Sequence, residues 1–199
     1  MSAALQRVGM FGGAFDPPHR AHVALAEAAV RQLGLDRLYI FPTGNAWHKD
    51  RTLTPAEHRL AMARLAFEAV PGAVVDDREL RRAGPTYSID TLRELHAEHP
   101  GAGLVLLMGE DQAAGFAGWR AWKDVAQLAT LAVAGRGAGA GLAALKALPG
   151  VRLEPLLLPL MPESATEIRA RLTAGQDITE LVDPRVASYI ARHNLYIAT

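Results

Sequence analysis

Short apolar runs alternate along this chain with segments whose apolar residues recur at helical spacing. The apolar runs predict strands at residues 8–11, 38–41, 73–75, 104–108, 131–134 and 151–158. The periodic segments predict helices at residues 21–33, 88–96, 115–128, 164–172 and 184–192, with another that begins near residue 54. This alternation predicts an α/β fold: a Rossmann-like, doubly wound parallel sheet with helices on both faces.

Local signals refine this outline. Thr54, Pro55 and Glu57 predict a capped helix start, with Thr54 as the cap, Pro55 at the first helical position and Glu57 completing a capping box. Small residues at 135–141 predict a flexible loop. Because there is no internal repeat and no linker, we expect residues 1–199 to form a single domain, with a small helical C-terminal part from about residue 160.

Composition excludes several classes of function. The chain has 21 basic and 21 acidic residues, and a formal net charge of zero argues against broad charge-driven binding to nucleic acid or to an anionic membrane. It has no cysteine, which removes disulfides and thiolate chemistry. The first residues lack a signal-peptide pattern, and no apolar run reaches the ~18 residues of a membrane span. We therefore expect a cytoplasmic protein without nucleic-acid or membrane partners, and leave open whether it forms a homo-oligomer.

The segment from Gly12 to His22 follows the first predicted strand and enters the first predicted helix. Gly12 and Gly13 let the backbone approach a ligand, and a helix start offers amides and a positive dipole end to a phosphate. His19 and His22 are three residues apart, so both project from one face of the first turn and could stabilise developing charge. The alternatives are a simple turn or a metal site, which would need a third ligand.

A second helix start of interest lies at Ser164. Ser164 and Glu167 form a capping box, which needs no functional explanation. Arg169, one turn into the helix, is the additional feature, because its planar guanidinium could reach back to a phosphate. We expect these two anion-binding helix starts to converge on one phosphate-bearing ligand.

Three further segments are candidates for substrate binding. His48 and Lys49 follow the second strand, where the lysine is either a charge clamp or a solvated surface residue. Residues 85–91 lead into a helix and either hold a carboxylate or serve as ordinary capping. Asp111 follows the strand at 104–108 and is well placed for ribose hydroxyls. Trp119 and the tryptophan three residues on are expected on one helix face, where packing is the commoner role.

Residues 12–22 resemble the Gly-Gly-x-Phe-Asp-Pro-x-His-x-Gly-His signature of nucleotidyltransferases with an HxGH motif, with Ala21 in place of the glycine. Within that superfamily they resemble bacterial nicotinate-nucleotide adenylyltransferases. Residues 163–169 are similar to the family motif Ile-Ser-Ser-Thr-x-Ile-Arg, from which Glu163 and Ala165 depart. Residues 48–49, 85–91, 109–119 and 186–196 extend the similarity over nearly the whole chain.

The resemblance implies a nucleotidyltransferase type of fold and an enzyme of NAD biosynthesis, which transfers AMP from ATP to nicotinate mononucleotide and releases pyrophosphate. The catalytic residues would be His19, His22, Lys49 and Arg169. ATP would be bound by Gly12, Gly13, Ala14, Phe15, His19, His22, Gly109, Asp111, Ser164, Thr166 and Arg169. Nicotinate mononucleotide would be bound by Ala14, His48, Lys49, Thr86, Tyr87, Ser88 and Trp119. Mg²⁺ would accompany ATP, held mainly by substrate phosphates and water rather than by a protein metal site.

Other functions have to be distinguished from this one. The acceptor could be nicotinamide mononucleotide, phosphopantetheine or another phosphate. The departures at Ala21 and Ala165 would also suit a nucleotide-binding sensor that has lost catalysis. A dinucleotide-binding oxidoreductase is disfavoured, because Gly12 and Gly13 are not followed by the required glycine spacing.

Overall fold

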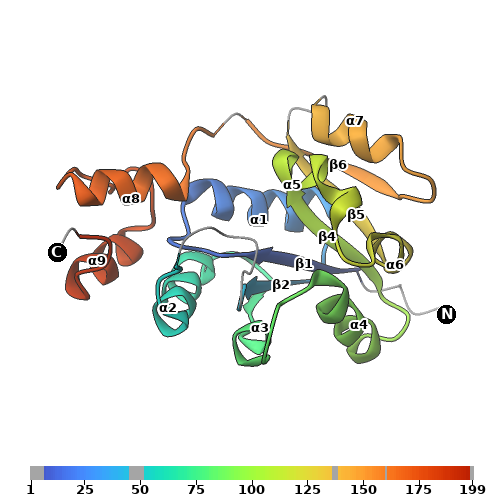
Figure 1. The fold of residues 1–199 in the computed structure, drawn as a ribbon, viewed down its shortest axis with the longest axis horizontal. Coiled ribbons are helices and arrows are strands. Elements are labelled where there is room, and N and C mark those ends of the chain that lie inside the picture. Colours follow the sequence, from blue (N-terminus) through green and yellow to red (C-terminus); the bar gives the residue numbers. More distant parts are fainter. Residues whose placement is uncertain (1–6, 45–51, 136–138, 160, 198–199) are drawn as a thin grey trace.

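A single parallel sheet forms the centre of the structure, a computed structural model that describes residues 7–44, 52–135, 139–159 and 161–197. Within these residues the sheet has the strand order β3-β2-β1-β4-β5-β6 (Figure 1). The strands are β1 (Arg7–Gly13), β2 (Arg37–Pro42), β3 (Ala73–Val75), β4 (Gly103–Gly109), β5 (Ala129–Gly135) and β6 (Leu153–Leu157). The order reverses between β1 and β4, which confirms the predicted doubly wound fold.

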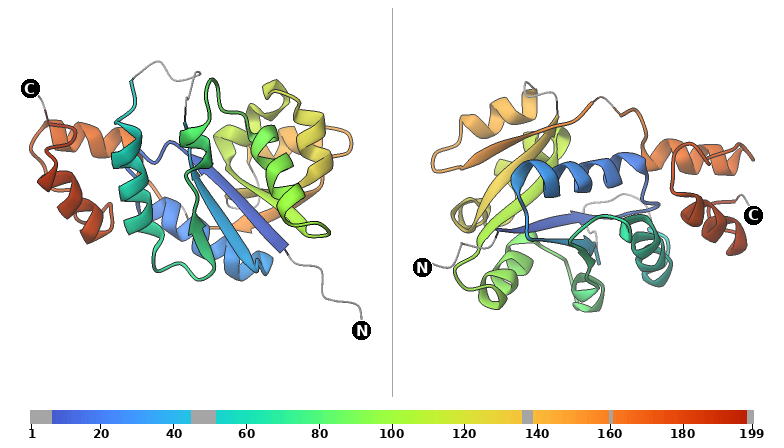
Figure 2. Two further views of the ribbon diagram at one scale, coloured as in Figure 1. Left: turned by 90° about the horizontal axis from the view of Figure 1, so that it is seen from below. Right: turned by 180° about the vertical axis from the view of Figure 1, so that it is seen from behind.

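Helices cover both faces of the sheet. The core cluster on one face contains residues of α1 (Arg20–Leu33) and α2 (Ala56–Phe67). The cluster on the other face contains residues of α4 (Ser88–Glu98), α6 (Trp122–Leu128) and α7 (Ala140–Lys146). Three short elements, α3 (Arg78–Arg81), α5 (Glu110–Ala114) and the 3₁₀ helix η1 (Phe116–Gly118), lie in the connections. The last two helices, α8 (Ala165–Thr173) and α9 (Pro184–Arg192), lie together at one end of the molecule, beside α2 (Figures 1 and 2).

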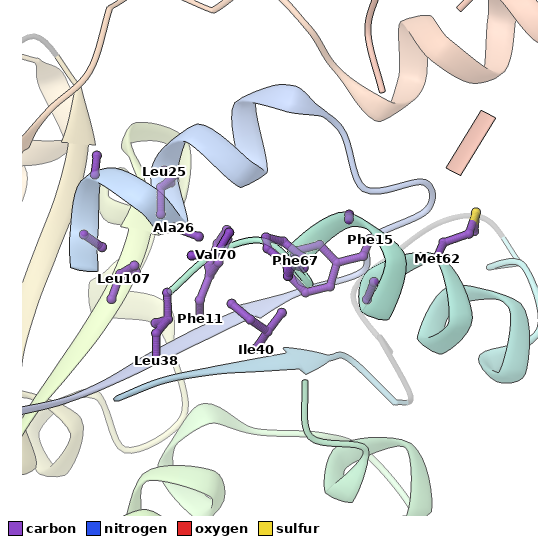
Figure 3. Packing of buried hydrophobic residues seen from close by; sticks show 14 of the residues in the cluster. Phe11, Phe15, Leu25, Ala26, Leu38, Ile40, Met62, Phe67, Val70 and Leu107 are labelled. Atoms are coloured by element: carbon purple, nitrogen blue, oxygen red, sulfur yellow. The ribbon is translucent and has the colours of Figure 1, made fainter. Parts of the chain in front are cut away.

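The two cores follow from side-chain alternation in strands that are buried on both faces. In β2, Leu38 and Ile40 enter the cluster beneath α1 and α2, whereas Tyr39 and Phe41 enter the cluster on the other face. Figure 3 shows the first cluster, in which the rings from β1 and α2 pack against aliphatic side chains. Burying each such side chain contributes roughly 1.5–3 kcal/mol, so the sheet and its helices are held by packing on both sides.

The start of α2 differs from the predicted capped start. The helix begins at Ala56, so Pro55 precedes the first helical residue, and no side chain caps it. The Thr54 amide instead donates to Asp16 Oδ2 at 3.3 Å, and the Thr54 carbonyl accepts from Arg59 Nε at 2.9 Å. Asp16 and Arg59 are both buried and require polar partners, so these tertiary bonds replace the predicted capping box.

The predicted helix at 115–128 is wrong in extent. Its region contains η1 and then α6, which begins only at Trp122, because Ala121 takes a left-handed conformation with φ of 52°. Trp119 follows η1 and Trp122 begins α6, so the two rings do not share one helix face.

The predicted loop at 135–141 is also corrected in part, and residues 136–138 lie outside the described residues. Strand β5 includes Gly135, and α7 begins at Ala140. The carboxylate of Glu110 accepts from the amides of Gly141 at 2.9 Å and Leu142 at 3.3 Å. A residue about thirty positions earlier therefore caps α7, which no local pattern could indicate.

Candidate active site

The carboxyl ends of β1 and β4 meet where the strand order reverses, which is where doubly wound sheets bind ligands. Phe11 pairs with Leu107, so the glycines that end these two strands lie at the same edge of the sheet. Gly12 and Gly13 prove to be the last residues of β1 rather than part of a turn. A Cβ at Gly12 would meet no atom within 4 Å, whereas one at Gly13 would lie 2.9 Å from the Phe15 ring. Gly12 therefore leaves open space at the strand end, and Gly13 makes room for Phe15.

The structure brings His19 and His22 together at the start of α1, as predicted. His19 is the N-cap residue, and the two ring centroids are 3.7 Å apart. The His19 amide donates to Nδ1 of His22 at 3.2 Å. Because that nitrogen accepts, neutral His22 carries its proton on Nε2, where it can be donated to a ligand.

His19 is buried, with 8% of its surface exposed. Burial lowers the pKa of His19 to about 4, so the ring is neutral near pH 7 in the absence of ligand. Its Nδ1 is buried and makes no hydrogen bond to the described residues. Before a ligand binds, His19 is thus a hydrogen-bonding group rather than the cation that a charge-neutralising role would suggest.

Phe15 lies in the core rather than in the site. Its side chain is 1% exposed and meets the rings of Phe11 and Phe67 at centroid distances of 5.4 and 5.3 Å (Figure 3). It also packs edge-on against His22, at 5.1 Å. Any contact of Phe15 with ATP would therefore be through its main chain, while its ring holds His22 in place.

The first helical amide of α1 is already used within the protein. The amide of Arg20 donates to the carbonyl of Leu181 at 2.9 Å, and the Arg20 guanidinium reaches the carbonyl of Thr179 at 3.4 Å. The amides of His19 and His22 also have partners, at His22 Nδ1 and the His19 carbonyl, so little remains of the predicted row of unpaired amides. The histidine side chains gain importance as ligand contacts for this reason.

The second helix start lies against the first site. The Ser164 hydroxyl accepts from the Glu167 amide at 3.1 Å, so the predicted cap is present. The Glu167 carboxylate accepts from Arg171 at 2.6 Å, and no bond to the Ser164 amide completes the predicted capping box among the described residues. Arg169 Nη1 donates to the carbonyl of Asp16 at 2.8 Å, and its Nη2 donates to Thr166 Oγ1 at 3.1 Å. The guanidinium thus lies on the loop between β1 and α1, across 153 positions of sequence.

Asp16 organises this meeting of segments. It is 1% exposed, and its Oδ1 accepts from the Tyr196 hydroxyl at 2.6 Å. Its Oδ2 accepts from the Thr54 amide and its carbonyl from Arg169. Burial, followed by the hydrogen bond to Asp16, raises the pKa of Tyr196, so the phenol stays protonated as the donor. One signature residue thus joins the starts of α1 and α2, α8 and the C-terminal segment.

Sequence reasoning missed Arg59, which is 3% exposed within α2. Its Nη1 donates to the carbonyls of Ala14 at 3.0 Å and Thr43 at 2.8 Å. These carbonyls follow the ends of β1 and β2, so Arg59 holds both strand ends in one arrangement. The available signal was its position: Arg59 shares a buried helical stripe with Met62, Ala63 and Ala66, where a charge is unexpected.

The expected acceptor residues lie near the end of β2 and on α4. Thr86 Oγ1 is buried, makes no hydrogen bond to the described residues and would lie 3.0 Å from a Cβ at Gly44. Such a Cβ would lie only 2.1 Å from the carbonyl oxygen of Glu79, so Gly44 has to be glycine. Burial raises the pKa of the Glu79 carboxyl to about 7, and this group accepts from Thr91 Oγ1 at 2.7 Å.

Tyr87 and Trp119 both pack against the core cluster on the face where α4 lies beside α6. The Arg120 guanidinium lies over the Tyr87 ring, at 4.5 Å from its centroid, and Trp119 lies against Phe116 at 5.5 Å. Ser88 begins α4. Asp111 is exposed in the first turn of α5, the helix whose N-cap is Gly109. These elements cover the face of the sheet opposite to α1 and the histidine pair. His48 and Lys49 lie outside the described residues.

Among the described residues, no three or more His, Asp or Glu side chains are grouped so that they could hold a metal ion. None of the helices formed by these residues has both the length and the apolar character needed to cross a membrane.

Comparison with known proteins matches residues 10–171 to the family model described as Cytidylyltransferase-like. The chain is 51% identical over 195 residues to a probable nicotinate-nucleotide adenylyltransferase of Albidiferax ferrireducens, covering 96% of this chain and 98% of that one. It is 42% identical over 203 residues to the corresponding protein of Methylibium petroleiphilum, covering 98% and 95%.

Two solved structures share the fold. Plasmodium falciparum nicotinic acid mononucleotide adenylyltransferase complexed with NaAD superimposes with a TM-score of 0.77 at 20% identity, covering 96% of this chain and 97% of that one. A putative nicotinate-nucleotide adenylyltransferase from Vibrio parahaemolyticus superimposes with a TM-score of 0.73 at 18% identity, covering 98% of each chain.

Proposed function

This chain belongs to the nicotinate-nucleotide adenylyltransferase family within the cytidylyltransferase-like proteins, and from that premise we propose how its site performs the family reaction. The enzyme transfers AMP from ATP to nicotinate mononucleotide, forming nicotinate adenine dinucleotide for NAD biosynthesis and releasing pyrophosphate. The observation that carries the proposal is the contact between two remote segments: the histidine pair at α1 and Arg169 of α8 share the loop that follows β1.

In the reaction, an oxygen of the acceptor 5′-phosphate attacks the α-phosphorus of ATP. The bond from that phosphorus to the bridging oxygen breaks, and its electron pair leaves with pyrophosphate. No covalent bond to the protein is required, so positioning and charge stabilisation supply the rate. Nε2–H of His22, fixed as a donor by the His19 amide, and the Arg169 guanidinium would stabilise the charge that builds on the phosphates.

His19 would act first as a neutral group. Its Nδ1 has no partner among the described residues, and its low pKa keeps the ring neutral, so this nitrogen can form a hydrogen bond to a ligand. A nearby polyanion favours the protonated ring, so binding of ATP raises the pKa of His19 from its unliganded value. Lys49 is proposed as a further cation on the acceptor side, from its place in the sequence.

Mg²⁺ is proposed to arrive with ATP and to be held by phosphate oxygens and water. Both carboxylate oxygens of buried Asp16 already accept hydrogen bonds from the protein, so Asp16 fits a structural role better than that of a metal ligand. We further propose the cytoplasm as the site of action, because a chain without cysteine fits a reducing compartment.

The acceptor side is proposed to be formed by Thr86, Tyr87, Ser88 and Trp119. The buried hydroxyl of Thr86 is the best supported of these, since it needs a partner that the described residues do not supply. The adenosine side is proposed to be formed by Gly109 and Asp111, at the end of β4.

The deciding experiment measures pyrophosphate release from ATP with nicotinate mononucleotide, nicotinamide mononucleotide or phosphopantetheine as acceptor. We expect the highest kcat/KM with nicotinate mononucleotide and a dinucleotide product of matching mass. Faster turnover of another acceptor would assign the chain to a different acceptor specificity within the superfamily. Tight ATP binding without pyrophosphate release from any acceptor would instead indicate a sensor without catalysis.

A further inference from the structure

Tyr196, in the C-terminal segment, makes a long-range hydrogen bond to the candidate site. The Tyr196 hydroxyl donates to Asp16 Oδ1 at 2.6 Å, 180 positions away in sequence. Asp16 is 1% exposed, so this bond lies in the interior, where an unpaired carboxylate oxygen is costly. The bond is therefore a strong constraint on the loop that contains Asp16.

The backbone at both ends of this contact is strained. Tyr196 has φ of 65° and Phe15, next to Asp16, has φ of 47°. Residues with bulky side chains rarely adopt this left-handed conformation, and it persists only where the surroundings enforce it. Such strain is concentrated at functional sites, so it indicates that the C-terminal segment has a role beyond packing.

Tyr196 is also tied to α8, the helix that carries Arg169. Thr173 Oγ1 lies 3.2 Å from the Tyr196 carbonyl and 2.9 Å from the Arg169 carbonyl, and contacts both. Arg169 in turn donates to the carbonyl of Asp16. Tyr196, Asp16, Arg169 and Thr173 thus form a closed ring of contacts between α8, the loop after β1 and the C-terminal segment.

We propose that Tyr196 is a positioning residue for ATP. By fixing the position of Asp16 relative to α8, it determines where the Arg169 guanidinium meets the triphosphate. This rests on the proposed function for the identity of the nucleotide. Tyr196 does not touch the reacting atoms; it acts through Asp16 and Arg169.

The chain offers a matched control in Tyr189. Its hydroxyl bonds Nδ1 of His58 at 2.9 Å and joins α9 to α2, so it also ties the C-terminal part to the rest of the protein. It has no contact with Asp16 or Arg169 among the bonds of the described residues. Tyr196→Phe and Tyr189→Phe each remove one phenolic hydroxyl, but only the first touches the ring of contacts.

The experiment measures the Kd of a non-hydrolysable ATP analogue by calorimetry, together with KM for each substrate, in both variants of the full chain. We expect Tyr196→Phe to weaken analogue binding and raise KM for ATP by about tenfold, the scale of one buried hydrogen bond to a charged group. KM for nicotinate mononucleotide should change less than twofold. Tyr189→Phe should leave both constants unchanged, even if its Tm falls equally.

A double-mutant cycle tests the route of the effect. If Tyr196 acts through Arg169, Tyr196→Phe should have little further effect on ATP binding in an Arg169→Lys background. Additive effects, or equal losses in the two tyrosine variants, would overturn the proposal. Should Tyr196→Phe fail to fold, Thr173→Val removes the two contacts that join Tyr196 to α8, and an unchanged Kd in that variant would also overturn the proposal.

These readouts separate the two proposals. If the wild-type chain makes no dinucleotide, the proposed function fails, while the Kd for the analogue still tests Tyr196. If the wild type is active and the tyrosine variants bind the analogue alike, only the role of Tyr196 fails.

Discussion

The starts of α1 and α8 have comparable sequence signals but are built differently. At α1 the N-cap is His19, 8% exposed, and His22 is held between the His19 amide and the buried ring of Phe15. At α8 the N-cap is Ser164, an exposed residue whose hydroxyl accepts from a backbone amide of its own helix.

This difference divides the site into a fixed half, which is the start of α1, and a positioned half, which is the start of α8. The α1 half is immobilised by the core, because His22 packs against the buried rings of Phe11 and Phe15 and His19 packs against His22. Helix α8 buries Ile168 in the core, but Arg169 itself is placed by individual polar bonds, to the Asp16 carbonyl and to Thr166 Oγ1. A capping signal therefore marks where a helix begins, but burial decides how firmly that beginning is held.

The largest effect is expected in the fixed half. His22→Ala removes the Nε2–H donor, and we expect kcat to fall by about 10²–10³, the loss typical of one transition-state donor. Initial-rate kinetics with saturating substrates measure this. His96→Ala, which removes an exposed histidine of α4, is the control. Near-normal turnover in His22→Ala would take His22 out of the mechanism.

The second prediction concerns the pH dependence of stability. Folding lowers the pKa of His19 from 6.5 to about 4, so between these values the unfolded chain binds a proton that the folded chain does not. The free energy of unfolding should therefore fall as the pH falls from 6.5 to 4, by at most roughly 3 kcal/mol from this residue.

Urea unfolding at pH 7.5, 5.5 and 4.5 measures the slope, and His19→Gln should flatten it. Because serine does not titrate and Ser164→Ala keeps His19, that variant should show the same pH slope as the wild type. Identical pH slopes in the wild type and His19→Gln would show that His19 is not a buried neutral group.

A smaller effect is expected at the positioned half. Arg169→Lys keeps the charge but loses the planar fork that reaches Asp16 and Thr166 together, so kcat/KM for ATP should fall by about tenfold. KM for the acceptor should hardly change. The control is Arg171→Lys on the same helix, whose partner is Glu167. An equal rise of KM for both substrates would contradict the assignment of Arg169 to the triphosphate.

The smallest effect is expected at the cap of α8. Ser164→Ala should lower the free energy of unfolding by about 1 kcal/mol, as loss of an N-cap does. It should also raise KM for ATP by about twofold, because the cap orders the turn that presents Arg169. Asp183→Ala removes the corresponding cap of α9, at the Arg185 amide, and should lower stability without changing KM. Equal KM values in the two variants would limit Ser164 to a structural role.

Much of the fold was predictable because its signals are local. Six apolar runs predicted the six strands, and the alternation with helices predicted the parallel sheet. The pairing of His19 with His22 followed from helical spacing, and the approach of Arg169 to the first loop was expected from two separate helix starts. The roles of these residues in binding substrates stay predictions, as does the single-domain organisation.

The errors occurred where distant residues override local patterns. The capping box at Thr54 was replaced because buried Asp16 and Arg59 use its backbone groups. The start of α7 depends on the carboxylate of Glu110, which lies 31 positions before Gly141. None of these follows from a window of neighbouring residues.

Apolar periodicity and motif spacing thus specified the strands, most of the longer helices and the candidate residues of the site, because those properties depend on neighbours within a few positions. The low pKa of His19, the use of Arg59 to hold two strand ends, and the junction of Tyr196 with Asp16 depend on burial and on partners that are far apart in the chain. Desolvation and long-range hydrogen bonds exist only once the chain is folded, so only the tertiary structure could reveal them.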